Sequence, residues 1–139
     1  MKYTYKQIKV HAMYIVLNKL FFDKSLPNVT VALIPCKRYA DVNVENNILF
    51  VDLFSDLEDY ELIGFILFEM CQLHAFNGQY RSRADIAIAL ASILDQVGFY
   101  IVDNEIKVSE RFNPTDAEYT EIEKDILFTI KDMSECLDI

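Results

Sequence analysis

The order of apolar and polar positions along the chain predicts an α+β domain. Residues 5–22 have the apolar spacing of a helix. Short runs in which apolar residues alternate with small or polar ones, bounded by turn-forming residues, follow at 29–34, 38–44 and 47–53 and predict three strands. Because these strands are clustered and do not alternate with helices, we expect a small sheet against which the next helix packs.

The middle of the chain predicts two more helices and a hairpin. The first helix is capped by Asp59, runs to Phe76 and ends at Asn77 and Gly78. The second, rich in alanine and isoleucine, runs from Ser82 to Gly98. Strands 99–102 and 105–108 follow, joined by a two-residue turn at Asp103 and Asn104.

Residues 113–139 predict an acidic amphipathic helix. Thr115 and Glu118 form a capping box, and the segment holds eight acids against Lys124 and Lys131. Apolar residues recur at steps of three and four, namely Tyr119, Ile122, Ile126, Ile130, Met133 and Leu137. Such a stripe packs on the core of its own domain, and the same spacing suits a partner helix, so both interpretations stay open.

Composition narrows the class of protein. A chain of 139 residues that is 53% hydrophobic fits one domain, residues 1–139, with a sizeable core. No apolar run approaches the length of a membrane span, and the first residues do not resemble a signal peptide, so we expect a cytoplasmic protein without a membrane segment. The three cysteines are odd in number and far apart, which predicts reduced thiols.

The net charge of −9 makes nucleic acid an unlikely partner. Residues 41–61 alone hold seven acids and no base. A basic face formed by Lys2, Lys6 and Lys9 on the first helix could still contact phosphate, although such lysines are more often simply solvated.

Residues 62–74 are the most informative stretch for chemistry. In an H-E-x-x-H helix the two histidines leave one face a turn apart and bind one zinc ion, and the glutamate activates the water bound to the metal. Here Glu69 has the place of the glutamate, but Phe68 and Gln72 have the places of the histidines. Phenylalanine has no lone pair and glutamine is a poor zinc ligand, so no metal is expected.

The flanking residues resemble the SprT-like (spartan-type) zinc metallopeptidases over roughly residues 10–110. In that family a helix that ends in Asn is followed by an aromatic pair, a polar turn and a Leu-Pro before the first strand, and residues 17–31 are similar to this segment. Residues 66–73 are similar to the family's zinc-binding helix. The third zinc ligand of the family follows a Tyr, and here Arg81 follows Tyr80. The resemblance implies a zincin-like fold that has lost its metal and its catalytic residues and acts by binding another protein. Shorter members of the family occur on phages and mobile elements, which suggests that origin for this chain.

An enzyme with an unrecognised site is the alternative. It would be a hydrolase that uses Glu69, Cys71 and His74, or a metalloenzyme that recruits carboxylates such as Asp52 or Asp56. The simpler expectations are a solvent-facing or hydrogen-bonded Glu69, an inert buried Cys71, and a Phe68 that fills the volume of the missing metal as a core residue. Arg81 and Arg83 are expected to pair with nearby acids such as Asp85, and the alternative is that they face a ligand anion or a partner's carboxylate across the former cleft.

Overall fold

The expected α+β architecture is confirmed by a computed structural model, which describes residues 4–77, 91–92, 95, 99–102, 105–108 and 117–137. Its elements in chain order are α1 (Tyr5–Phe21), β1 (Thr30–Ile34), β2 (Ala40–Asn43), β3 (Ile48–Asp52), α2 (Asp59–Phe76), β4 (Phe99–Val102), β5 (Glu105–Val108) and α4 (Ala117–Leu137). The first helix, the three clustered strands and the second helix therefore lie where the sequence predicts them.

The three clustered strands form one mixed sheet in the order β1-β3-β2. Strand β2 is antiparallel to β3, as a tight turn between them requires, and the side chain of Asn43 accepts hydrogen bonds from the backbone N–H groups of Glu45 and Asn46 in that turn. Strand β1 is parallel to β3, which the sequence analysis did not predict. Strands β4 and β5 pair separately as the expected antiparallel hairpin.

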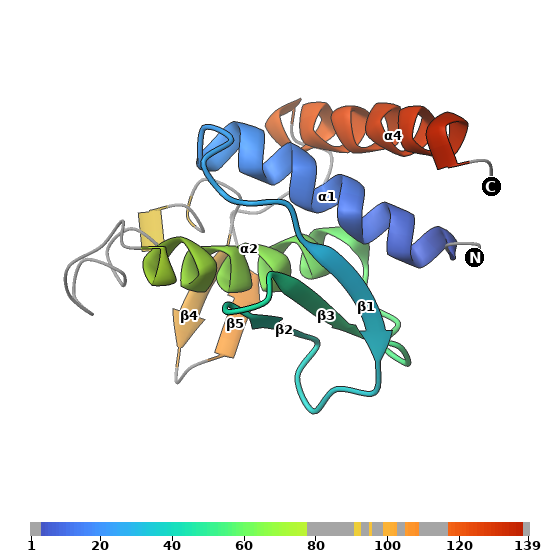
Figure 1. Ribbon diagram of the computed structural model, residues 1–139. Helices are drawn as coiled ribbons and strands as arrows, with labels where there is room; N and C mark the ends of the chain where they lie inside the picture. The colour runs from blue at the N-terminus through green and yellow to red at the C-terminus, as the bar shows by residue number, and fades with distance from the viewer. Residues whose placement is uncertain are drawn as a thin grey trace.

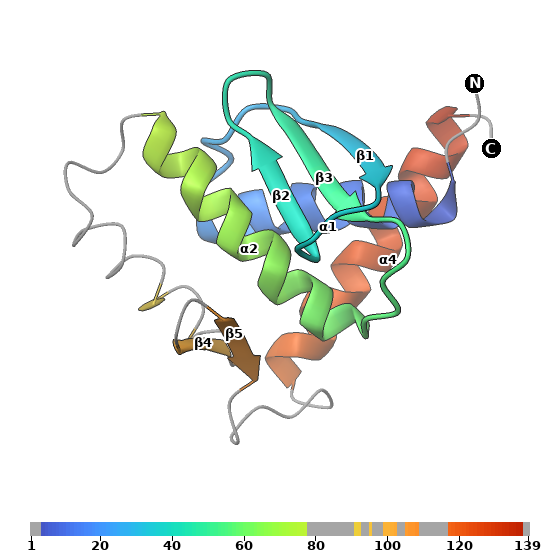
Figure 2. The same cartoon turned by 90° about the horizontal axis from the view of Figure 1, so that it is seen from below.

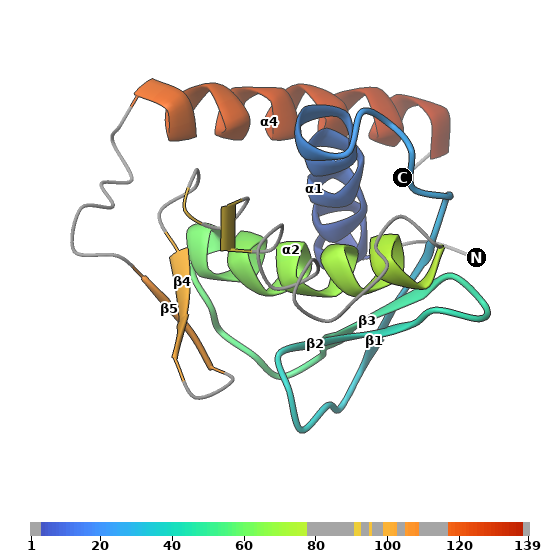
Figure 3. The same cartoon turned by 90° about the vertical axis from the view of Figure 1, so that its left-hand side faces the viewer.

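Helix α1 lies at the centre of the molecule, between α4 on one side and the sheet with α2 on the other (Figures 1 and 3). It is buried on almost all sides, which explains why apolar residues occur all around it without a single polar face. Its buried side chains are Ile8, Val10, Ala12, Met13, Tyr14, Val16 and Leu17. Helices α1 and α2 cover the same face of the sheet, and α2 lies beside β2.

The turn from α1 into β1 is fixed by polar groups of the helix. The amide of Asn18 donates to the carbonyl of Leu26 at 3.1 Å and accepts from the N–H of Leu26 at 3.1 Å. The hydroxyl of Tyr14 donates to the carbonyl of Pro27 at 2.6 Å. Asp23 and Lys24 adopt the left-handed conformation that reverses the chain there.

The apolar stripe of α4 packs on the domain's own core, as expected. Tyr119, Ile122, Ile126 and Ile130 are buried and Met133 packs against the same core. The stripe faces α1, so it is not free to bind a partner helix. The predicted capping box at Thr115, the turn at 103–104 and most of the helix expected over 82–98 lie outside the described residues.

Two details differ from the sequence analysis. Asp59 is the first residue of α2 and not its cap, because Glu58 has the extended conformation of a cap residue and its N–H donates to the side chain of Glu61. The second concerns Lys6 and Lys9, which hold the fold together and are not simply solvated. Lys6 Nζ donates to the carbonyls of Asp52 and Ser55, and Lys9 Nζ lies 2.9 Å from Asp59.

No helix in the described part of the chain combines the length and the apolar composition that crossing a bilayer requires.

Neighbouring residues of α4 offer a matched test of this packing. Ile126 is 3% exposed and Leu127 is 54% exposed. We expect Ile126→Ala to lower the free energy of unfolding by about 2 to 4 kcal/mol, since it removes buried apolar atoms and leaves a cavity. Leu127→Ala should cost less than about 0.5 kcal/mol. Urea denaturation of both variants measures the difference, and equal losses would show that α4 does not pack on α1 through this face.

Candidate functional site

The motif helix α2 is enclosed on most of its sides. It contacts α1, the edge strand β2 and strand β5. Its buried residues are Leu62, Ile63, Gly64, Ile66, Leu67, Glu69, Met70, Cys71 and Leu73. Because this helix packs on several neighbours at once, few of its positions can reach solvent.

The two positions that would hold zinc ligands are separated by their surroundings. Phe68 packs against the hydrophobic core, in line with the expected core residue, but it is only partly buried. Gln72, one turn further along, is exposed. One position thus packs against apolar side chains and the other lies in water.

Glu69 is the finding that departs most from expectation. A solvent-facing carboxylate was one expectation, and it is wrong, because Glu69 is only 3% exposed; the other expectation, a hydrogen-bonded carboxylate, is met in part by the backbone of Val42. The correction has a simple cause, because Ile66 and Leu73, one turn away on either side, are fully buried and Glu69 shares their face of the helix. Its Oε2 atom has no hydrogen-bond partner.

The groups around Glu69 come from β2 and the loop before it. A guanidinium nitrogen of Arg38 lies 3.9 Å from Oε1, the backbone of Val42 hydrogen-bonds to the carboxylate, and the carboxylate of Asp41 lies on the same strand. Burial, and after it the charge of Asp41, raise the pKa of Glu69, while Arg38 and the hydrogen bond from Val42 lower it, and the net result is a pKa of about 8.

The burial of Glu69 outweighs its ion pair. The side chain of Arg38 is 66% exposed, so its charge is screened by water, and 3.9 Å is a long separation for an ion pair. A carboxyl group with a pKa near 8 holds its proton at neutral pH. In that state it can donate a hydrogen bond, but it cannot accept a proton as a general base would.

Cys71 and His74 do not form an activated nucleophile. Cys71 is buried, and burial raises the pKa of its thiol to about 12, so the thiolate is scarce at neutral pH. The ring of His74 packs edge-on against Phe22 with 5.1 Å between centroids, and burial lowers its pKa. Burial likewise lowers the pKa of His11, on α1, which fits a structural histidine.

The carboxylates considered for a metal site are not gathered into one. Within the described residues, no cluster of three or more His, Cys, Asp or Glu side chains could hold a metal ion. One oxygen of Asp52 accepts hydrogen bonds from the backbone N–H groups of Cys36 and Phe54, and Asp56 is exposed. Arg81, Arg83 and Asp85 lie outside the described residues.

Sequence reasoning missed Arg38 and Asp41 as neighbours of Glu69. They precede it by about thirty residues, and only the pairing of β2 at the sheet edge beside α2 brings them together. Periodicity carried no signal for the burial of Glu69, because apolar residues occur on nearly all sides of this helix.

Comparison of the chain with models of protein families, with curated proteins and with solved structures finds no match.

The raised pKa of Glu69 predicts how stability depends on pH. Below about pH 4.5 the group is protonated in both states. As the pH rises toward 8, the unfolded chain loses this proton while the folded chain keeps it, so stability falls. We expect Glu69→Gln to remove this loss, which amounts to at most about 1.4 kcal/mol per pH unit for one proton.

Urea denaturation at pH 5, 6.5 and 8 measures the effect, and the exposed Glu121, with Glu121→Gln, provides the matched control. The gain in stability of Glu69→Gln over the wild-type protein should grow with pH, and that of Glu121→Gln should not. A gain that is the same at all three pH values would contradict a raised pKa.

Proposed function

We propose that the chain is a non-catalytic SprT-like domain, zincin-like in fold, that acts by binding another protein. The observation that carries the proposal is the enclosure of Glu69. A zincin glutamate must hold a water molecule on a metal ion as a base, whereas this carboxyl group is 3% exposed, faces the sheet edge and keeps its proton at neutral pH.

The helix positions beside Glu69 support the loss of catalysis. Phe68 offers no lone pair and packs on the core, and Gln72 is a neutral amide in solvent. The competing hydrolase would need Cys71 as a thiolate or Glu69 as a base, and burial opposes both charged forms. No feature of the described residues favours that alternative.

The segment between α1 and β1 supports the SprT-like part of the proposal. Its resemblance rests on an Asn before an aromatic pair and a Leu-Pro before the first strand, and these residues interact: the side chain of Asn18 holds both backbone groups of Leu26, and Tyr14 holds the carbonyl of Pro27. The pattern therefore has a structural role in this chain.

The zinc content of the purified protein tests the proposal that the domain is non-catalytic. Protein purified without chelator should contain much less than one zinc per chain by plasma emission spectroscopy, because its ligand positions hold Phe68 and Gln72. A content near one zinc per chain, lost on treatment with a chelator, would overturn the proposal.

Restoring the two histidines tests whether other groups of the site oppose zinc. The resemblance puts the cation of Arg81 at the position of the third zinc ligand, next to the two histidines. A positive charge at about 4 to 6 Å weakens the binding of zinc by about a kcal/mol or more. We expect Phe68→His with Gln72→His to bind zinc weakly by calorimetry and to leave casein uncut. Tight binding with proteolysis would contradict the placement of Arg81, and adding Arg81→His to the double variant provides the positive comparison.

A further inference from the structure

The three-stranded sheet has a second face that no described helix covers. Successive side chains of a strand point to opposite faces, and the buried Val31, Ala40, Leu49 and Val51 face α1 and α2. The opposite face therefore carries Ala32 beside Phe50, and Ile34 beside Asp52, in the register of β1 and β3. Figure 2 looks directly onto this face, with the sheet in front of the helices.

This outer face combines apolar side chains with the polar Thr30, Asp41, Asn43 and Asp52. We call it the outer sheet face and define it by Ala32, Ile34, Ile48 and Phe50 of the strands with Phe54 of the following turn. Ala32, Ile48 and Phe50 are partly buried, Ile34 is 39% exposed, and Phe54 is 75% exposed. Contiguous exposed apolar side chains of this kind mark binding surfaces in soluble domains.

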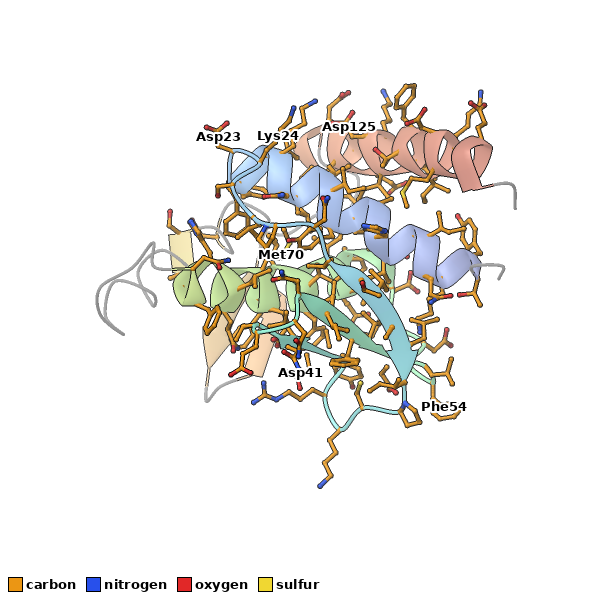
Figure 4. The ribbon with its side chains drawn as sticks, in the orientation of Figure 1. Asp23, Lys24, Asp41, Phe54, Met70 and Asp125 are labelled. Atoms are coloured by element: carbon orange, nitrogen blue, oxygen red, sulfur yellow. The ribbon has the colours of Figure 1, made fainter. Side chains whose placement is uncertain are left out.

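Phe54 stands on a turn that is held in place. One oxygen of Asp52 accepts from the N–H of Phe54 and from that of Cys36, the N–H of Leu53 donates to the carbonyl of Ile34, and Lys6 Nζ donates to the carbonyls on both sides of the turn. An exposed aromatic ring on a fixed backbone loses little entropy when a partner covers it, which is the character of an interface anchor. Figure 4 shows Phe54 at the end of β1 on the side of the molecule away from α4.

Charge decides which kind of partner fits. The three strands carry Asp41 and Asp52 and no base, and the exposed acids Asp56 and Glu58 follow Phe54 in the chain. Of the nearby bases, Lys9 pairs with Asp59, Lys6 donates to backbone carbonyls under the turn, and Arg38 is 66% exposed and lies 3.9 Å from Glu69. The exposed Lys37 and Arg38 of the β1–β2 loop add positive charge to one end of the rim, and the acids Asp41, Asp52, Asp56 and Glu58 outnumber them.

These charges disfavour the other occupants. A second copy would place equal acidic faces opposite each other, with a net charge of −9 on each chain. Nucleic acids and anionic lipid surfaces are repelled in the same way. The complementary partner is a protein segment with an apolar stripe and basic flanks.

We propose that the outer sheet face, anchored by Phe54, is the docking surface for a cationic amphipathic helix of a partner protein. The dimensions agree, because three strands span about 10 Å between their outer axes and a helix is about 10 Å wide. This inference rests on the proposed function in that the domain acts by binding protein, and it assigns the surface and the chemistry of the partner.

The test uses a synthetic 18-residue helical peptide of leucine and lysine, labelled with fluorescein, and its leucine and glutamate counterpart. Fluorescence anisotropy with the full chain should show binding of the lysine peptide and not of the glutamate peptide. Phe54→Ala should weaken binding about tenfold or more, as loss of an interface anchor does. Phe128→Ala, which removes a ring that is 73% exposed on α4, should change the affinity less than about twofold.

A charge pair separates local complementarity from the general attraction of an acidic protein for a basic peptide. Asp56→Lys and Asp125→Lys change the net charge equally, and Asp125 lies on α4, at the opposite side of the molecule (Figure 4). We expect Asp56→Lys to weaken binding by several fold more than Asp125→Lys. Both aspartates are exposed, so the two variants should fold, and circular dichroism checks this.

Equal effects of the two phenylalanine variants, or of the two lysine variants, would overturn the proposal. A homodimer in sedimentation velocity that Phe54→Ala dissociates would also overturn it, because the occupant would then be a second copy. These results do not depend on the zinc content. The docking proposal and the proposal of a non-catalytic domain can therefore fail separately.

Discussion

The packing of α2 against the β2 edge of the sheet is the constraint on which the character of this protein depends. A helix that contacts α1, β2 and β5 at once must be apolar on most sides, and α2 is. The same contacts place position 69 in the interface with the sheet. A carboxyl group there is desolvated, and its proton is held more tightly than in water.

The burial of the Glu69 carboxyl group therefore opposes its use as a catalytic base. A glutamate that activates water needs access to solvent, a metal ion to lower the pKa of that water, and its own negative charge. The arrangement around Glu69 gives it a distant, solvent-screened arginine and an aspartate that disfavours its charge. The proposed docking surface lies on the outer sheet face, opposite the helices, where Phe54 is 75% exposed.

Local patterns predicted the elements well because each one carries its own signal. The stripe of α4 identified Tyr119, Ile122, Ile126 and Ile130 as core residues, and alternation located the strands. The parallel pairing of β1 with β3 was not predictable, because it depends on how the chain returns after β2. Nor did periodicity reveal the environment of Glu69: apolar residues surround α2 on nearly all sides, so no polar face shows which way a charged residue points. Arg38 and Asp41 carried no local signal at all.

The pKa of the Glu69 carboxyl group is the most direct test of the view that this residue is part of the interior and not a catalytic base. Its side-chain carboxyl carbon can be followed by ¹³C NMR between pH 3 and 10, with the signal assigned by its loss in Glu69→Gln. We predict a titration midpoint at about pH 8, where an ordinary glutamate would titrate near 4.5. A midpoint at or below 4.5 would show a solvated or well-paired carboxylate and would contradict the burial of Glu69 in the interior.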